Sequence, residues 1–214
     1  WRAAYPALEV EVVGCPKLDT LPRREPGPGP VVAVSFHWGT PGRRSHPENE
    51  SRGSWREYQQ AVVDLASHVR LIGTGHPKAL HEMAPVFEAA GIPVVEDFGE
   101  VLRRADVLVC DTNSALYEFS STGRMVVVVN GSHFRRQVHH GLRFDWGPCT
   151  NVGVQCNAPD QLVSAVERAL ESRPEDVAAR ERALDIAYAY RTGGAQRAAA
   201  ALVDWAGTLE RKAA

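Results

Sequence analysis

Short, continuous apolar runs, each followed by a stretch with helical periodicity, constrain the fold of this chain most strongly. They predict strands at residues 31–36, 69–74, 92–95, 107–110, 125–130 and 152–155. Because these runs are mostly apolar throughout, rather than alternating with polar residues, both faces of the sheet should be covered. The pattern therefore predicts an α/β fold, a Rossmann-like doubly wound parallel sheet.

The stretches between and after the strands carry helix signals. They predict helices at residues 54–66, 77–90, 99–104, 114–122, 159–171, 176–190 and 195–210. The Pro- and Gly-rich stretch 22–30 predicts a linker, and the polar run 40–53 an exposed loop. We therefore expect a connecting segment and linker at 1–30, and one Rossmann-like domain with C-terminal helices at 31–214.

Composition excludes several classes of protein. The hydrophobic fraction of 44% and the charged fraction of 23% are those of an ordinary folded, soluble protein. A net charge of -2 with dispersed Lys and Arg leaves no basic surface for nucleic acid, so we expect no such partner. Cysteines without CxxC spacing argue against zinc sites or disulfides and favour a reducing, cytoplasmic compartment.

The ends of the chain suggest an incomplete protein. It begins Trp1-Arg2 without an initiator Met or a charged-then-apolar leader. No apolar stretch approaches the roughly 20 residues of a membrane helix. We expect a fragment cut from a longer protein.

Polar residues follow the run at 107–110, where a parallel sheet of this class binds its ligands. Asp111, Thr112, Asn113 and Ser114 lead into a predicted helix, whose free N–H groups and dipole suit a diphosphate. Glu118 lies one turn beyond Ser114 and suits a ribose hydroxyl. The alternatives to ligand binding are that the turn only caps the helix and that Glu118 is a solvated surface residue.

A second candidate loop follows the run at 69–74. Thr74 and Gly75 precede His76, and Pro77 suits the first turn of the next helix. The His76 imidazole could stabilise charge on a leaving nucleotide diphosphate, as a proton donor or as a cation, which makes it the candidate catalytic residue. The alternative is an ordinary surface histidine.

The end of the first predicted strand supplies further candidates. His37 could contact phosphate, whereas Trp38 could stack on a ligand or plug the sheet edge, and the second role is favoured. His139 and His140 form the only adjacent histidine pair, but no third ligand follows at metal-binding spacing. No metal and no cofactor are expected.

Several segments together resemble those of a known family. They are residues 13–19 (VGCPKLD), 75–77 (GHP), 110–119 (CDTNSALYEF), 123–126 (GRMV), 141–146 (GLRFDW) and 191–197 (RTGGAQR). In this order they resemble the C-terminal domain of the CDP-glycerol glycerophosphotransferase family. Lys17 stands for the family's usual Arg, Thr112 for an aromatic residue, Asn113 for the first Ser of a pair, and Met125 for a Pro.

The resemblance implies the C-terminal half of a GT-B fold and metal-independent transfer from a CDP-activated donor such as CDP-glycerol. The transferred glycerophosphate, polyol phosphate or sugar would go to an acceptor hydroxyl in teichoic acid or similar cell-wall polymer synthesis. That work would occur at the cytoplasmic face of the membrane, with peripheral contact made through the full-length protein. By the resemblance, His76, Asn113, Ser114 and Glu118 bind the donor.

The same resemblance implies a missing N-terminal acceptor-binding domain, so we expect the fragment to be inactive alone. Two alternatives stay open. One is a nucleotide-sugar glycosyltransferase or UDP-sugar 2-epimerase domain, which would prefer uridine. The other is a non-catalytic nucleotide-binding Rossmann domain.

Overall fold

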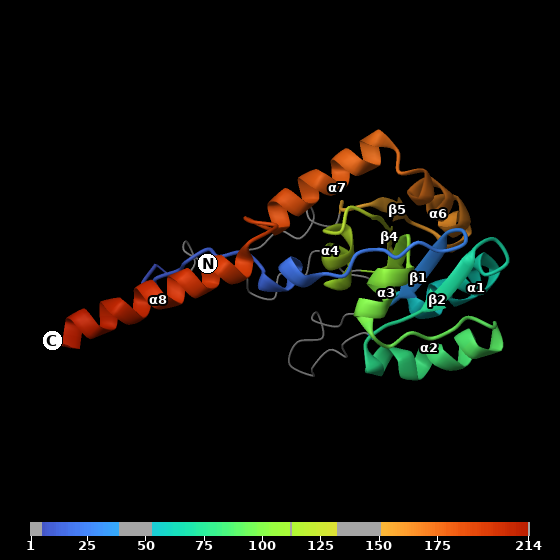
Figure 1. The fold of residues 1–214 in the computed structure, drawn as a ribbon. Helices are drawn as coiled ribbons and strands as arrows, with labels where there is room; N and C mark the ends of the chain where they lie inside the picture. The colour runs from blue at the N-terminus through green and yellow to red at the C-terminus, as the bar shows by residue number, and fades with distance from the viewer. Residues whose placement is uncertain (1–5, 39–52, 112, 132–150, 214) are drawn as a thin grey trace.

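A five-stranded parallel sheet forms the centre of the domain (Figure 1). The structure is a computed structural model and describes residues 6–38, 53–111, 113–131 and 151–213. Its strands are β1 Val31–Ser35, β2 Arg70–Gly73, β3 Val107–Cys110, β4 Met125–Val129 and β5 Val154–Cys156. They lie in the order β2-β1-β3-β4-β5, and every neighbouring pair is parallel.

Helices cover both faces of this sheet. They are α1 Trp55–Leu65, α2 Pro77–Ala89, α3 Phe98–Arg104, α4 Ala115–Ser120, α6 Leu162–Glu171, α7 Pro174–Ala187 and α8 Gly194–Ala213, with short 3-10 helices η1 Pro16–Thr20 and η3 Pro159–Gln161. Val32 and Val34 of β1 join the core under α1, α2 and α6. Val31 and Ala33 join the core under α3, α4 and α7. The predicted doubly wound α/β class is confirmed.

The predicted strand at 92–95 is reduced to a single bridge. Val94 pairs with Gly73 at the outer edge of β2, and Gly73 N donates to Pro93 O at 2.8 Å. Pro93 has no N–H to donate, so the pairing cannot extend from the bridge toward residue 92. Counting this bridge as an edge strand gives the order of a Rossmann sheet, in which the direction of winding switches between β1 and β3.

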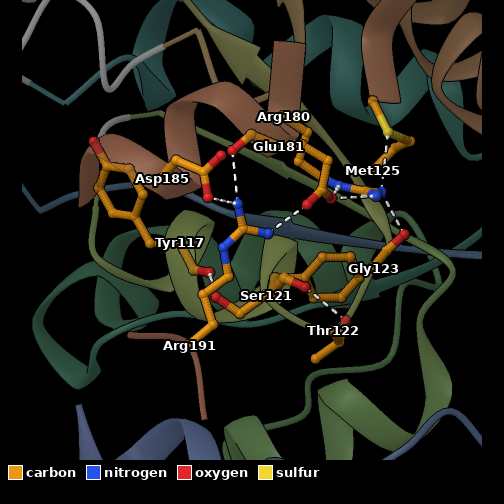
Figure 2. Close-up of polar contacts among 10 residues, drawn as sticks. Tyr117, Ser121, Thr122, Gly123, Met125, Arg180, Glu181, Asp185 and Arg191 are labelled. Atoms are coloured by element: carbon orange, nitrogen blue, oxygen red, sulfur yellow. Dashed lines mark hydrogen bonds and ion pairs between the residues drawn. The ribbon is translucent and has the colours of Figure 1, made fainter. Parts of the chain in front are cut away.

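A buried arginine joins α7 to the turn before β4 (Figure 2). Arg180 donates to the carbonyl oxygen of Gly123 and, at 2.8 Å, to Glu181. Arg191 donates to Glu181 and to Asp185. Hydrogen bonds from Arg191 and Arg180 hold the pKa of Glu181 below its ordinary value. These contacts fix the α7–α8 corner on the body of the domain.

The segment before β1 packs on the domain. Arg24 forms a two-pronged ion pair with Asp106, at 2.9 and 3.0 Å. Asp19 Oδ2 accepts a 2.8 Å hydrogen bond from Ala195 N at the start of α8. The stretch 22–30 forms neither helix nor strand, as its Pro and Gly content predicted.

Helix α8 extends away from the sheet, with the N-terminal segment beside its first part (Figure 1). Within the described ranges, no helix combines the length and apolar character needed to cross a membrane.

Candidate functional site

A pocket of about 260 Å³ lies at the carboxyl ends of β1, β2 and β3, at the winding switch. The loops after these three strands bring most of the predicted site residues into its lining. Those residues are His37, Thr74, Gly75, His76, Asn113, Ser114 and Glu118. Of the other two, Asp111 lies outside the lining and Thr112 lies outside the described residues.

Asp111 stabilises the backbone next to the pocket through hydrogen bonds. Its carboxylate is buried, and Oδ1 accepts from His37 N at 2.7 Å while Oδ2 accepts from Ser54 N at 3.0 Å. Burial raises the pKa of Asp111 to about 6, although hydrogen bonds from the backbone of Ser54 and His37 act in the opposite direction. The sequence prediction grouped Asp111 with the phosphate-binding residues; the structure engages both of its oxygens with backbone N–H groups instead.

In the turn after β3, the Asn113 side chain rather than the Ser114 side chain accepts a hydrogen bond from the start of α4. Ser114 occupies the N-cap position of α4, but its side chain makes no cap hydrogen bond. Asn113 Oδ1 accepts from Ala115 N at 3.0 Å and closes the turn. The exposed Ser114 hydroxyl therefore has no capping role that would compete with a ligand.

His76 occupies the N-cap position of α2, and its side chain caps the helix. Its Nδ1 accepts a 3.2 Å hydrogen bond from Lys78 N, and Pro77 occupies the first helical position. In a neutral ring the acceptor nitrogen carries no proton, so the proton resides on Nε2. The nitrogen that can donate to a ligand is Nε2.

Trp38 stands between two histidines at the mouth of the pocket. Its ring centroid lies 4.2 Å from that of His37 and 4.4 Å from that of His76. The residue is 42% exposed, so the favoured role as a buried plug was wrong. Among the described contacts of its ring are the two imidazoles and, at 5.7 Å from the ring centroid, Lys78 Nζ.

The two histidines differ in their surroundings. Burial, and then the nearby His76, lower the pKa of His37 below its ordinary value. At neutral pH His37 therefore contributes an uncharged ring.

An ion pair crosses the pocket. Lys17 Nζ lies 2.7 Å from Glu118 Oε2, and the two side chains are 61% and 15% exposed, respectively. Lys17 comes from η1, far from Glu118 in the sequence. Glu96 and Phe98 also line the pocket, and neither directly follows a strand of the sheet. Sequence reasoning gave no binding role to Lys17, Glu96 or Phe98.

Some sequence predictions cannot be placed. His139, His140 and the 141–146 segment lie outside the described residues. Among the residues that are described, no group of three or more His, Cys, Asp or Glu side chains could hold a metal ion.

Comparison with known proteins yields structural matches alone. No protein-family model matches the chain, and no curated protein matches its sequence. The solved structures it resembles include the wall teichoic acid polymerase TagF, with a TM-score of 0.44 and 14% identity over 92% of this chain and 46% of that one. A TagF variant soaked with CDPG gives a TM-score of 0.43 and 15% identity over 92% and 44%. The chain thus spans less than half the length of these proteins, and the chemistry of its pocket has to be argued from its own residues.

Proposed function

We propose that this chain is the donor-nucleotide-binding half of a GT-B-type transferase. It would hold a CDP-activated donor while a glycerophosphate, polyol phosphate or sugar moves to an acceptor hydroxyl during cell-wall or surface polymer synthesis. The observation that carries the proposal is the pocket at the winding switch. There the loops after three strands supply imidazole, hydroxyl and amide groups, and Glu118 of α4 supplies a carboxylate.

Each group has a role suited to its position. The Ser114 hydroxyl, which makes no cap hydrogen bond, binds donor phosphate. Glu118 accepts a hydrogen bond from a donor hydroxyl. His76 donates from Nε2 to the oxygen that keeps the bonding electrons when the transferred group departs, which stabilises the leaving nucleotide phosphate.

The acceptor side of the reaction lies outside this chain in the proposal. The acceptor oxygen attacks the transferred group as the bond to the nucleotide phosphate breaks, and the acceptor proton goes to a base on another domain. Holding both reactants in one crevice supplies the proximity term. The full-length protein would work at the cytoplasmic face of a membrane.

A thermal-shift screen of nucleotides tests the proposal. A ligand that binds only the folded state raises the melting temperature. We expect CDP to raise it more than UDP or purine nucleotides do. A preference for UDP would favour a nucleotide-sugar enzyme instead. No shift with any nucleotide would contradict a nucleotide-binding domain of any kind.

The isolated chain should bind a pyrimidine nucleotide weakly and turn over no donor, because half of the active site is proposed to lie elsewhere. Calorimetry measures the binding, and release of nucleotide product from the donor in the presence of acceptor measures turnover. Polymer or glycoside synthesis by this chain alone would contradict the two-domain arrangement.

Ser114→Ala should weaken nucleotide binding by about 1.5–3 kcal/mol, the usual value of a hydrogen bond to a charged group. The melting temperature should stay unchanged, because the Ser114 hydroxyl makes no cap hydrogen bond. Asn113→Ala is the matched control, since it removes the acceptor of the Ala115 N–H and should lower the melting temperature. Unchanged affinity in Ser114→Ala would show that its hydroxyl does not meet a phosphate.

A further inference from the structure

The charges around the pocket are poorly matched to a diphosphate. Among the described lining residues, Lys17 alone carries a permanent positive charge, whereas Glu96 and Glu118 are acidic. His37 is held neutral at pH 7 by burial. Moreover, Lys17 is paired with Glu118, so its charge is already neutralised. To bind a polyanionic ligand favourably, the pocket would have to free the Lys17 ammonium group from its ion pair with Glu118.

Contacts made by residues next to Lys17 in the sequence hold this segment at the pocket. Asp19 Oδ2 accepts from Ala195 N at 2.8 Å, and Arg197 Nε donates to Val13 O at 3.0 Å. Both contacts bind the η1 segment to the start of α8. The Lys17 side chain itself is 61% exposed, so its ammonium group can move while η1 stays fixed.

The opposite member of the pair is held more firmly. Glu118 lies on α4 with a side chain that is only 15% exposed. Leu116 and Phe119 of the same helix are fully buried against the sheet. Any rearrangement of the ion pair therefore moves Lys17 rather than Glu118.

We propose that Lys17 is a phosphate-binding residue of this pocket, stored on Glu118 in the free protein and transferred to the diphosphate when a nucleotide binds. The inference rests on the proposed function, which supplies the diphosphate. When Lys17 leaves, Glu118 becomes free to accept a hydrogen bond from a hydroxyl of the same ligand. One exchange thus prepares both ends of the site.

The exchange predicts opposite effects for its two members when the probe is inorganic pyrophosphate, which lacks the ribose and polyol hydroxyls that a nucleotide donor offers to Glu118. Lys17→Ala should weaken pyrophosphate binding about 10-fold or more, the scale of one lost charge-assisted hydrogen bond. Lys17→Arg should restore most of it. Glu118→Gln should tighten pyrophosphate binding several-fold, because the carboxylate no longer competes for Lys17 or repels the anion.

Calorimetric titration of the chain with pyrophosphate and with CDP measures these effects. Lys78→Ala is the control for general charge, since Lys78 lies near Trp38 but outside the pocket lining, and it should lose less affinity for either probe than Lys17→Ala does. Melting curves verify that each variant is folded, as expected for changes at an ion pair whose lysine is exposed.

The outcomes separate the two proposals. Wild-type affinity of Lys17→Ala for both probes overturns the role of Lys17 and leaves the nucleotide site standing. A loss of pyrophosphate binding in Lys17→Ala, with no added affinity for CDP over pyrophosphate in wild type, supports Lys17 and overturns the nucleotide donor. Weaker pyrophosphate binding in Glu118→Gln overturns the exchange, and failure of wild type to bind either probe overturns both proposals.

Discussion

We expect replacement of His76 by asparagine to lower turnover of the proposed full-length transferase about 100-fold or more, the scale expected for losing an acid catalyst or a charge stabiliser. The fold stays intact, because asparagine is among the best N-cap residues and can accept from Lys78 N in place of Nδ1. The measurement is a turnover rate at saturating donor beside a melting curve. Wild-type turnover in His76→Asn would remove His76 from the chemistry.

His76→Ala serves as the companion variant. It loses the imidazole and the cap together, so its turnover should fall as far as that of His76→Asn. Its melting temperature should also fall, by an amount equivalent to about 1 kcal/mol of lost capping. Turnover that follows the melting temperature, lost in the alanine variant but kept in the asparagine variant, would mean that His76 acts through the start of α2.

The second large effect is a pH dependence of stability from Asp111. Its pKa is about 6 in the folded protein, against an ordinary value of 3.8, so the folded state binds more protons than the unfolded state between these values. The stability that this group contributes is therefore fully present only well below pH 3.8, and it is lost as pH rises from there through about 6. At 1.36 kcal/mol for each pKa unit, the change amounts to about 3 kcal/mol.

Comparison with Asp111→Asn isolates this effect. The amide does not titrate, and every other ionisable group is present in both proteins. Denaturant unfolding at pH 4 and pH 7 should show wild type losing about 2.4 kcal/mol relative to the variant over that interval. Parallel pH profiles, or a wild type that gains on the variant as pH rises, would show that the two backbone N–H groups outweigh burial at Asp111.

The sequence was sufficient to predict the sheet and much of the pocket. Apolar runs such as Val107–Cys110 fix the strands, and parallel strands place the residues that follow them at one edge. His76 and Ser114 could therefore be grouped before any coordinates were known. The strand predicted at 92–95 failed for a local reason, the missing N–H of Pro93.

The remaining features depend on tertiary contacts that no local pattern encodes. Lys17 reaches Glu118 because η1 is bound to the start of α8, which joins opposite ends of the chain. Asp111 accepts a hydrogen bond from the backbone of Ser54 because the start of α1 lies over the end of β3. No local pattern indicates that Trp38 contacts imidazoles from two loops and is 42% exposed.

A crystal structure of the chain soaked with CDP tests the central claim most directly. The account predicts the diphosphate in the pocket between β1 and β3, with an oxygen within hydrogen-bonding distance of the Ser114 hydroxyl and of His76 Nε2. It also predicts that Lys17 Nζ has moved from Glu118 to a phosphate oxygen. CDP bound elsewhere on the protein, with this pocket vacant and the Lys17–Glu118 pair intact at a saturating concentration, would contradict the account.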